Sequence, residues 1–135
     1  MTKTTTEIPL TVLLVDDNPE TLHDTESFFK RMHLNLVAAN SPFGVTNLVQ
    51  RHDPDVIVLD VTMPGLNGDA LALLIRKECE TPIIYFSAMP EEELRDLVIL
   101  TSNSWYVLKS EGLVYLNEVI ERRFRSQKRH AKRPA

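Results

Sequence analysis

Short apolar runs alternate with longer amphipathic stretches along most of the chain. Five runs rich in aliphatic and β-branched residues occupy positions 10–15, 35–39, 56–59, 83–86 and 105–108. Such short apolar runs are typical of strands that are covered on both faces of a parallel sheet. The stretches between them carry apolar residues at helical spacing. They predict helices at about 19–33, 41–52, from 68 onward, 90–100 and 111–124.

This alternation predicts the fold class. Strands that alternate with helices and are joined by short turns form a parallel sheet with helices on both faces. Right-handed crossovers then leave few topologies. We therefore expect an α/β fold of the flavodoxin-like type, a doubly wound five-stranded parallel sheet of order 2-1-3-4-5 with five helices.

The helix boundaries carry their own signals. Asn18 is expected to cap the first helix with Pro19 at its first position, and Ser41 and Pro42 repeat this pattern for the second helix. Acidic residues after Pro90 favour a helix start there, because they complement the helix dipole. In the third helix the expected buried residues are Ala70, Leu71, Leu73, Leu74 and Ile75.

Length and charge define the domain organisation. At 135 residues the chain suits one domain, which we place at 10–125, after a lead-in at 1–9 and before a basic tail at 126–135. Seven Lys and Arg and no acidic residue lie in 122–135, so 1–121 carries a net charge of −11. The tail has three interpretations: a solvated helix end, contact with an acidic protein or an anionic membrane surface, and nucleic-acid binding, which is disfavoured because no base-reading element is visible.

Several function classes lack support in the sequence. No apolar run is long enough to cross a bilayer, and the N-terminus lacks the apolar core of a signal peptide. The single Cys79 excludes an internal disulfide and fits the cytoplasm, where we expect the protein to act. The four histidines lack metal-ligand spacing, and no phosphate-binding glycine loop is present.

Polar residues with chemical potential follow four of the five strands. Asp16 and Asp17 end the first strand, Asp60 the third, Ser87 the fourth and Lys109 the fifth. In a sheet of order 2-1-3-4-5 these ends meet at one edge, near the switch point between the first and third strands. Three carboxylates repel one another unless a cation lies among them. Oxygen ligands of this kind suit Mg²⁺, which completes its shell with water and a phosphate.

Four segments carry a family resemblance. They are V-L-L-V-D-D-N, V-I-V-L-D-V-T-M-P-G-L-N-G, I-I-Y-F-S-A and W-Y-V-L-K. With them the chain resembles the receiver domain of two-component response regulators, especially the single-domain chemotaxis type, over about residues 10–124. The resemblance implies a stand-alone switch in phosphorelay signalling that receives a phosphoryl group from a histidine kinase or a phosphotransfer protein.

The resemblance also implies roles for the residues at the strand ends. Asp60 would be the phosphoryl acceptor, and Asp17 and Asp60 would bind Mg²⁺ directly together with the backbone carbonyl of Thr62. Asp16 would act through water or the outer shell. Lys109 would pair with phosphoryl oxygens.

The resemblance further implies how the signal leaves the site. Ser87 would hydrogen-bond the phosphoryl group, and Tyr106 would be the switch aromatic that turns inward when Ser87 is drawn toward it. The surface of the fourth helix, fifth strand and fifth helix would then bind a downstream protein or form a homodimer. Chemistry would be limited to self-phosphorylation and slow autodephosphorylation, with no external substrate.

Three positions depart from the family pattern or leave alternatives open. Ser110 follows Lys109 where the family usually has proline. Trp105 stands beside the usual output surface, where it either anchors a partner or packs against the last helix. Thr62 tunes water attack in a direction that the sequence does not give. Two other functions remain as alternatives: an interaction module that works without phosphorylation, and a nucleic-acid-binding protein that acts through the basic tail.

Overall fold

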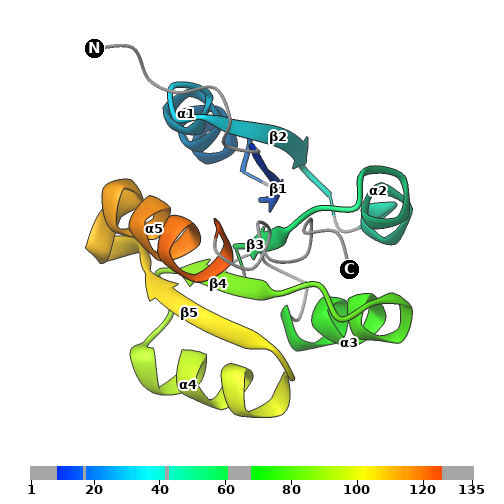
Figure 1. Ribbon diagram of the computed structural model, residues 1–135. Helices are drawn as coiled ribbons and strands as arrows, with labels where there is room; N and C mark the ends of the chain where they lie inside the picture. The colour runs from blue at the N-terminus through cyan, green and yellow to red at the C-terminus, as the bar shows by residue number, and fades with distance from the viewer. Residues whose placement is uncertain (1–8, 17, 42, 61–67, 126–135) are drawn as a thin grey trace.

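The sheet has the predicted architecture. A computed structural model describes residues 9–16, 18–41, 43–60 and 68–125. Five parallel strands lie in the order β2-β1-β3-β4-β5, as Figure 1 shows. Their bounds are β1 Leu10–Val15, β2 Leu34–Ala39, β3 Val56–Leu59, β4 Ile83–Ser87 and β5 Ser104–Leu108. The flavodoxin-like order predicted from the alternation of strands and helices is confirmed.

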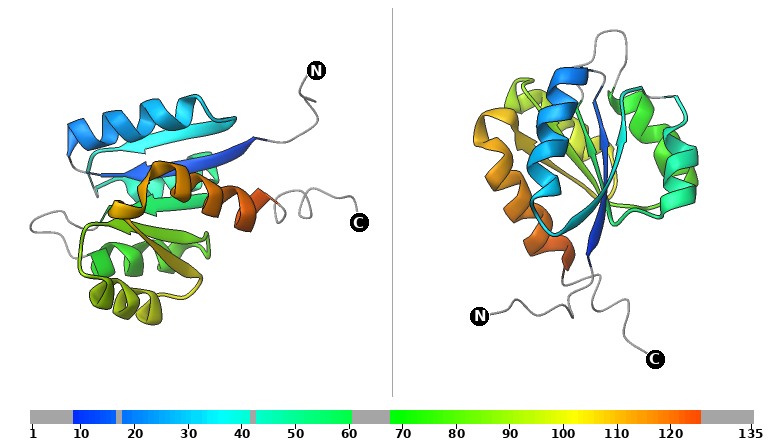
Figure 2. Two further views of the ribbon diagram at one scale, coloured as in Figure 1. Left: turned by 90° about the vertical axis from the view of Figure 1, so that its left-hand side faces the viewer. Right: turned by 90° about the horizontal axis from the view of Figure 1, so that it is seen from above.

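Helices connect each strand to the next and cover both faces of the sheet. Their bounds are α1 Pro19–Lys30, α2 Val45–His52, α3 Gly68–Glu78, α4 Glu91–Leu100 and α5 Gly112–Ile120. A 3₁₀ turn, η1 Lys109–Glu111, precedes α5, and a π-helical turn, η2 Glu121–Arg125, follows it. In Figure 2 α1 and α5 lie side by side on one face of the sheet, and α2 and α3 lie on the other.

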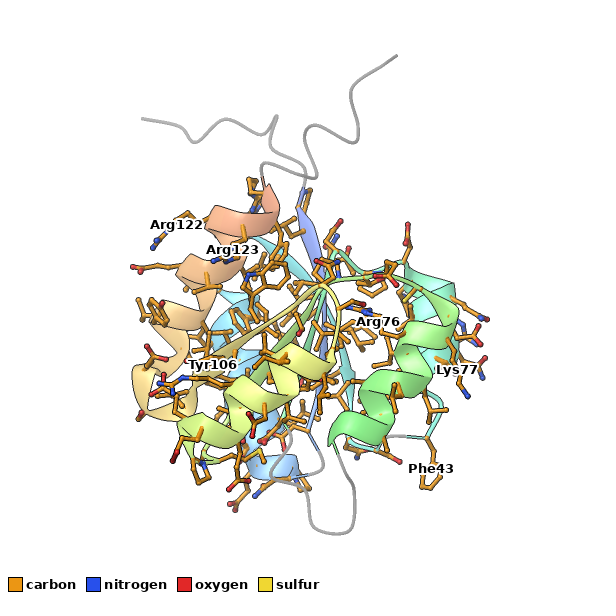
Figure 3. The ribbon with its side chains drawn as sticks, turned by 90° about the horizontal axis from the view of Figure 1, so that it is seen from below. Phe43, Arg76, Lys77, Tyr106, Arg122 and Arg123 are labelled. Carbon is orange, nitrogen blue, oxygen red and sulfur yellow. The ribbon has the colours of Figure 1, made fainter. Side chains whose placement is uncertain are left out.

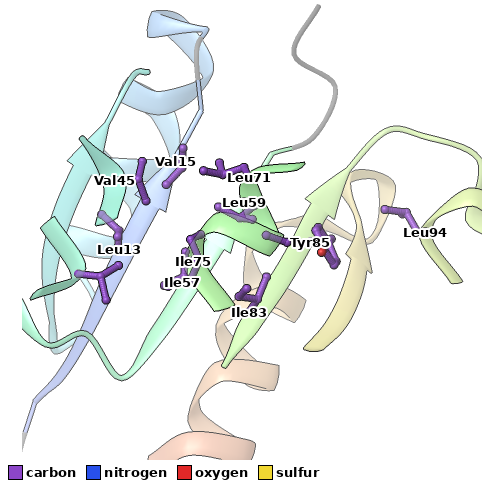
Figure 4. Close-up of a cluster of buried hydrophobic side chains, with 12 residues drawn as sticks. Leu13, Val15, Val45, Ile57, Leu59, Leu71, Ile75, Ile83, Tyr85 and Leu94 are labelled. Atoms are coloured by element: carbon purple, nitrogen blue, oxygen red, sulfur yellow. The ribbon is translucent and has the colours of Figure 1, made fainter. Parts of the chain in front are cut away.

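Two apolar cores form because side chains alternate between the faces of each strand. Leu13, Ile57 and Tyr85 point to the α2, α3 and α4 side, where they pack with residues such as Val45 and Leu94 (Figure 4). The neighbouring positions point to the α1 and α5 side and form the second core, whose buried members are Leu10, Val12, Leu14, Phe29, Val56, Val58, Ile84, Phe86, Val107, Leu116, Ile120 and Phe124. The central strands β1, β3 and β4 are therefore buried on both faces, as their apolar character predicted, whereas the edge strands β2 and β5 are mostly half-buried.

The helix starts were predicted with mixed success. The side chain of Asn18 caps α1 by accepting hydrogen bonds from the N–H groups of Glu20 and Thr21, as expected. The predicted start of the second helix at 41–42 was wrong. Ser41 Oγ accepts a hydrogen bond from Phe43 N at 3.1 Å, which makes a local turn, and α2 begins at Val45. Pro42 lies outside the described residues.

The predicted inner face of the third helix was partly wrong. Leu71 and Ile75 are buried as expected, but Ala70 is exposed, and Leu73 and Leu74 are 61% and 54% exposed. The third buried residue is Ala72, which the apolar pattern did not single out. Because α3 touches the sheet along one narrow stripe, apolar residues one or two positions away from that stripe face outward.

Other boundaries shift by a few residues. α1 ends at Lys30, before the predicted end near 32–33, and β2 begins one residue before the predicted strand. The last helical segment is regular only from Gly112 to Ile120, although its predicted inner residues Leu116 and Phe124 are buried. Across residues 9–16, 18–41, 43–60 and 68–125, no helix is long and apolar enough to span a membrane.

Candidate functional site

The sheet brings the predicted polar residues to one edge. Asp16 directly follows β1, and Asp60 directly follows the neighbouring strand β3. Asp16 N donates to Ala39 O at 3.0 Å and Asp60 N donates to Val15 O at 2.9 Å, so the sheet hydrogen bonds extend to both carboxylates. Each aspartate is therefore held by backbone contacts that its neighbouring strand supplies.

Ion pairs link the end of β5 to the ends of β3 and β1 at this edge. The ammonium group of Lys109, which follows β5, contacts the Asp60 carboxylate and lies 3.8 Å from Asp16 Oδ2. The side chains of Asp60 and Asp16 are only 6% and 10% exposed, whereas that of Lys109 is 25% exposed. One cation thus faces two buried carboxylates, and the ammonium nitrogen of the same lysine lies over the Phe86 ring, 5.8 Å from its centroid.

The electrostatics of this edge favour a further cation. The pKa of Asp16 is raised to about 6, chiefly by burial and also by the Asp60 carboxylate, against the lowering effects of the Asn18 N–H bond and of Lys109. A divalent cation beside the two carboxylates would remove the repulsion that contributes to this shift. The oxygen-only donor set fits Mg²⁺.

The proposed metal ligands are only partly within the described part of the chain. Asp16 and Asp60 are described and lie together, whereas Asp17 and Thr62 lie outside the described residues. Among the side chains that are described, no three His, Cys, Asp or Glu gather as a metal site. The set of ligands for Mg²⁺ therefore stays a prediction.

Ser87 completes the edge from β4. Its side chain is fully buried, and its Oγ accepts a hydrogen bond from Met89 N at 3.1 Å, which leaves the hydroxyl proton available for donation. Beside it lies an open hollow of about 260 Å³, lined by Ser87, Ala88, Met89, Glu91, Leu108, Lys109 and Ser110. A hydroxyl and an ammonium group therefore border a space next to the buried carboxylates.

Comparison with known proteins decides the family. The family model for the response regulator receiver domain matches residues 12–121. The chain belongs to this family. It is 35% identical over 85 residues to the protein PilH of Pseudomonas aeruginosa, a match that spans 60% of this chain and 69% of PilH.

Other relatives are longer than the matched part. The heme response regulator HssR of Staphylococcus saprophyticus is 25% identical over 99 residues, which are 73% of this chain and 44% of HssR. The transcriptional activator protein PfeR of Pseudomonas aeruginosa is 31% identical over 84 residues, which are 62% of this chain and 28% of PfeR. The receiver thus spans less than half the length of these two proteins.

Solved structures show the same fold. The receiver domain of the Francisella response regulator 1452 superposes with a TM-score of 0.73 and 24% identity over 88% of this chain and 98% of that one. The chemotaxis protein CheY4 of Vibrio cholerae superposes with a TM-score of 0.76 and 19% identity over 85% of this chain and 98% of that one.

In this receiver Tyr106 points toward the start of α4. The tyrosine is half-buried, and its hydroxyl donates to Glu91 Oε2 at 2.6 Å. The same oxygen lies 3.7 Å from Arg95 Nη2. The hydrogen bond with Tyr106 and the charge of Glu91 raise the pKa of the Arg95 guanidinium. Figure 3 shows Tyr106 next to α4.

Trp105 adopts the packed arrangement rather than a free surface position. Its ring is half-buried and meets Phe124 edge to face, with centroids 5.4 Å apart and an interplanar angle of 79°. The Arg123 guanidinium lies 5.1 Å from the centre of the same ring. Trp105 therefore packs β5 against the π-helical turn η2, and its role as a partner anchor stays a prediction.

The sequence did not single out two residues that hold the turns before and after β5. Glu111 accepts a hydrogen bond from the backbone of Leu108, and Arg76 binds carbonyl groups beyond α4. The only signal for Glu111 was its place near a helix start, where glutamate often reaches back to a backbone N–H. For Arg76 there was no local signal, because its acceptors Ser102 and Asn103 are 26 and 27 residues away.

Proposed function

We propose that this receiver is a phosphorylation switch whose acceptor is Asp60. The observation that carries the proposal is the buried Asp60 carboxylate, paired with Lys109 at the edge of the sheet beside Asp16. Family membership supports a role in phosphorelay signalling. The phosphoryl donor is a phosphohistidine on a histidine kinase or a phosphotransfer protein.

The chemistry is a transfer between two nucleophiles. A carboxylate oxygen of Asp60 forms a bond to phosphorus while the bond from phosphorus to the donor imidazole nitrogen breaks. That nitrogen keeps the electron pair and takes a proton from solvent. The ammonium group of Lys109 then pairs with a phosphoryl oxygen, and the Ser87 hydroxyl donates to another.

A bound Mg²⁺ would neutralise charge on the transferring group. Asp16, Asp17 and Asp60 would hold it together with the Thr62 carbonyl, with Asp16 acting largely through water. The described residues hold two buried carboxylates side by side. Their attraction to a cation is stronger here than in bulk water, because the effective dielectric constant is lower.

The switch follows from the added charge. Phosphorylation brings about −1.5 to −2 charges to a buried edge. Ser87 would move toward the phosphoryl group, the adjoining hollow would change shape, and Tyr106 would leave Glu91 and turn inward. The surface formed by α4, β5 and α5 would thereby change for a downstream protein or for a second copy of the chain.

Mass spectrometry of the intact protein tests the acceptor. The protein is incubated with acetyl phosphate and Mg²⁺, next to Asp60→Ala and to Asp24→Asn, which removes an exposed carboxylate from α1. We expect one phosphoryl adduct in the unmodified protein and in Asp24→Asn, dependent on Mg²⁺, and none in Asp60→Ala. Absence of the adduct, together with partner binding that survives Asp60→Ala, would instead support an interaction module that needs no phosphorylation.

A further inference from the structure

Lys109 begins a three-residue turn that contains no proline to restrict its backbone. η1 spans Lys109–Glu111, between the edge strand β5 and α5. Its central residue is Ser110, which does not fix the backbone φ angle as a proline would. The position of the Lys109 backbone must therefore be set by contacts around the turn.

Two such contacts are present. Glu111 Oε1 accepts a hydrogen bond from Leu108 N at 2.9 Å, so that the side chain at the end of the turn holds the last residue of β5. The N–H of Gly112 donates to the carbonyl of Lys109 and closes the turn. Gly112 has φ +89°, a conformation that side chains rarely adopt, which explains a glycine at this position.

The Glu111 contact lies at a sensitive position in the chain. β5 is an edge strand, so an N–H that does not bond to β4 must find an acceptor outside the sheet. Leu108 pairs with Ser87 in the β4–β5 register, and the next residue is Lys109. The bond from Glu111 thus fixes the peptide between Val107 and Leu108, one residue before Lys109 and next to the hollow that Ser87, Leu108 and Lys109 line.

We infer that Glu111 is a positioning residue that holds the Lys109 ammonium group against Asp60 through its hydrogen bond to the Leu108 backbone. The relevant group is the acceptor oxygen and not the negative charge. Glutamine keeps an acceptor oxygen at the same place, whereas alanine removes it. The inference rests on the proposed function where it concerns the rate of phosphorylation, and on the ion pair alone where it concerns the position of Lys109.

Four proteins separate these possibilities. Glu111→Ala removes the acceptor, and Glu111→Gln keeps it without the charge. Glu118→Ala is a matched control, because it removes an exposed glutamate from α5 that pairs only with Arg122, at 3.6 Å, among the contacts known for it. The unmodified protein is the fourth. Two quantities are measured: the rate of phosphorylation by acetyl phosphate, and the NMR signal of the Lys109 ammonium protons, which exchange slowly with water only while the group is paired.

We expect Glu111→Ala to slow phosphorylation about three- to tenfold, since a displaced lysine stabilises the transferring group less well. The Lys109 signal should broaden or vanish in this variant. Both quantities should stay near the unmodified values in Glu111→Gln and Glu118→Ala. Circular dichroism verifies that all four proteins are folded.

The possible failures are distinguishable. Equal phosphorylation rates and equal Lys109 signals in Glu111→Ala and the unmodified protein would overturn the inference. Loss of both in Glu111→Gln as well would assign the effect to charge and also overturn it. If the unmodified protein forms no adduct, the proposed function fails. In that case a Lys109 signal lost only in Glu111→Ala still supports the positioning role, and a signal retained there refutes it.

Discussion

Lys109 determines the charge balance of the site. Its ammonium group is the cation that the structure places between Asp60 and Asp16, two carboxylates that are almost fully buried. Removal of one partner from a buried ion pair leaves the other charge uncompensated, which is costly. The lysine therefore contributes to the ground state of the site as well as to the proposed phosphoryl transfer.

We predict that Lys109→Ala keeps the fold but weakens phosphorylation. The β5 backbone is paired with β4 up to Leu108, so the strand does not depend on the lysine side chain. The rate of adduct formation with acetyl phosphate should fall about 100- to 1,000-fold, as for the loss of one stabilising donor in acyl transfer. Intact-protein mass spectrometry measures the rate, and an unchanged rate would contradict the role of Lys109.

Asp16 gives a prediction about pH. Its pKa is about 6, against 3.8 for an ordinary aspartate, because burial disfavours the charged form. Between these two values the folded protein binds more protons than the unfolded chain, so this group makes the protein less stable as pH rises. Above about pH 6 Asp16 is ionised in the folded protein, and the free-energy cost of burying its charge is then fully present.

We therefore predict that Asp16→Asn stabilises the metal-free protein at pH 8, by about 1 to 3 kcal/mol. Asparagine keeps an oxygen that can accept the hydrogen bond from Asn18 N. The gain should shrink toward zero as pH falls to about 4. Denaturant unfolding in the presence of a chelator measures it, and Asp24→Asn is the control. A gain that did not depend on pH would contradict the assigned cause.

The sequence predicted the residues of the site better than the contacts that hold them. Each predicted residue lies at the end of a strand that the local apolar pattern reveals, and the strand order brings these ends together. These residues are Asp16, Asp60, Ser87 and Lys109. The bond from Glu111 to Leu108 depends on the rotamer of an exposed side chain, which no spacing rule gives.

At the scale of single elements, α4 is held differently at its two ends. Its first residue, Glu91, accepts the hydrogen bond from Tyr106, and its N-cap residue Pro90 offers no side-chain cap. Its far end runs into a turn that Arg76 of α3 holds, with Nε donating to Ser102 O at 2.9 Å and Nη2 to Asn103 O at 3.0 Å. Thr101, the C-cap residue of α4, is hydrogen-bonded through its hydroxyl to the hydroxyl of Tyr85 inside the core.

We predict that Arg76→Met lowers the free energy of unfolding by about 1 to 3 kcal/mol, because the hydrogen bonds from a charged donor to the Ser102 and Asn103 carbonyls are lost. Only 10% of the Arg76 side chain is exposed. Lys77→Met is the matched control, since this exposed neighbour points away from the protein in Figure 3. Denaturant unfolding compares the two variants, and an equal effect would show that the loss of positive charge, not the lost bonds, is the cause.

The helices and strands were predicted well where apolar residues are also the buried ones. They were predicted less well where apolar residues are exposed or where a capping residue type forms a different local contact. All five strands were found because parallel strands are apolar on both faces. The inner face of α3 was predicted only in part because the exposed Leu73 and Leu74 are as apolar as the buried Leu71. The start of α2 was missed because Ser41 satisfies the local rule for a cap but uses its oxygen in a turn.

At the scale of the whole molecule, metal binding and stability are coupled. A ligand that binds only the folded state raises the free energy of unfolding, by about 2.7 kcal/mol when its concentration is one hundred times the dissociation constant. We predict that Mg²⁺ raises the thermal midpoint of the unmodified protein and has little effect on Asp60→Ala. Thermal unfolding with Mg²⁺ and with a chelator measures the difference. Equal shifts in both proteins would place the metal elsewhere.

The unequal anchoring of α4 means that loss of the hydrogen bond between Tyr106 and Glu91 would free the first turn of the helix, while Tyr85 would still hold Thr101 after its last turn. Under the proposed switch, displacement is largest at Glu91 and Arg95, near Tyr106, and smallest at Ile99 and Leu100. A partner that binds at the first pair would distinguish the phosphorylated protein from the unphosphorylated one. A partner that binds the exposed Ile99 and Leu100 would bind the phosphorylated and unphosphorylated protein with equal affinity. It would therefore stay bound when Asp60 is phosphorylated or dephosphorylated.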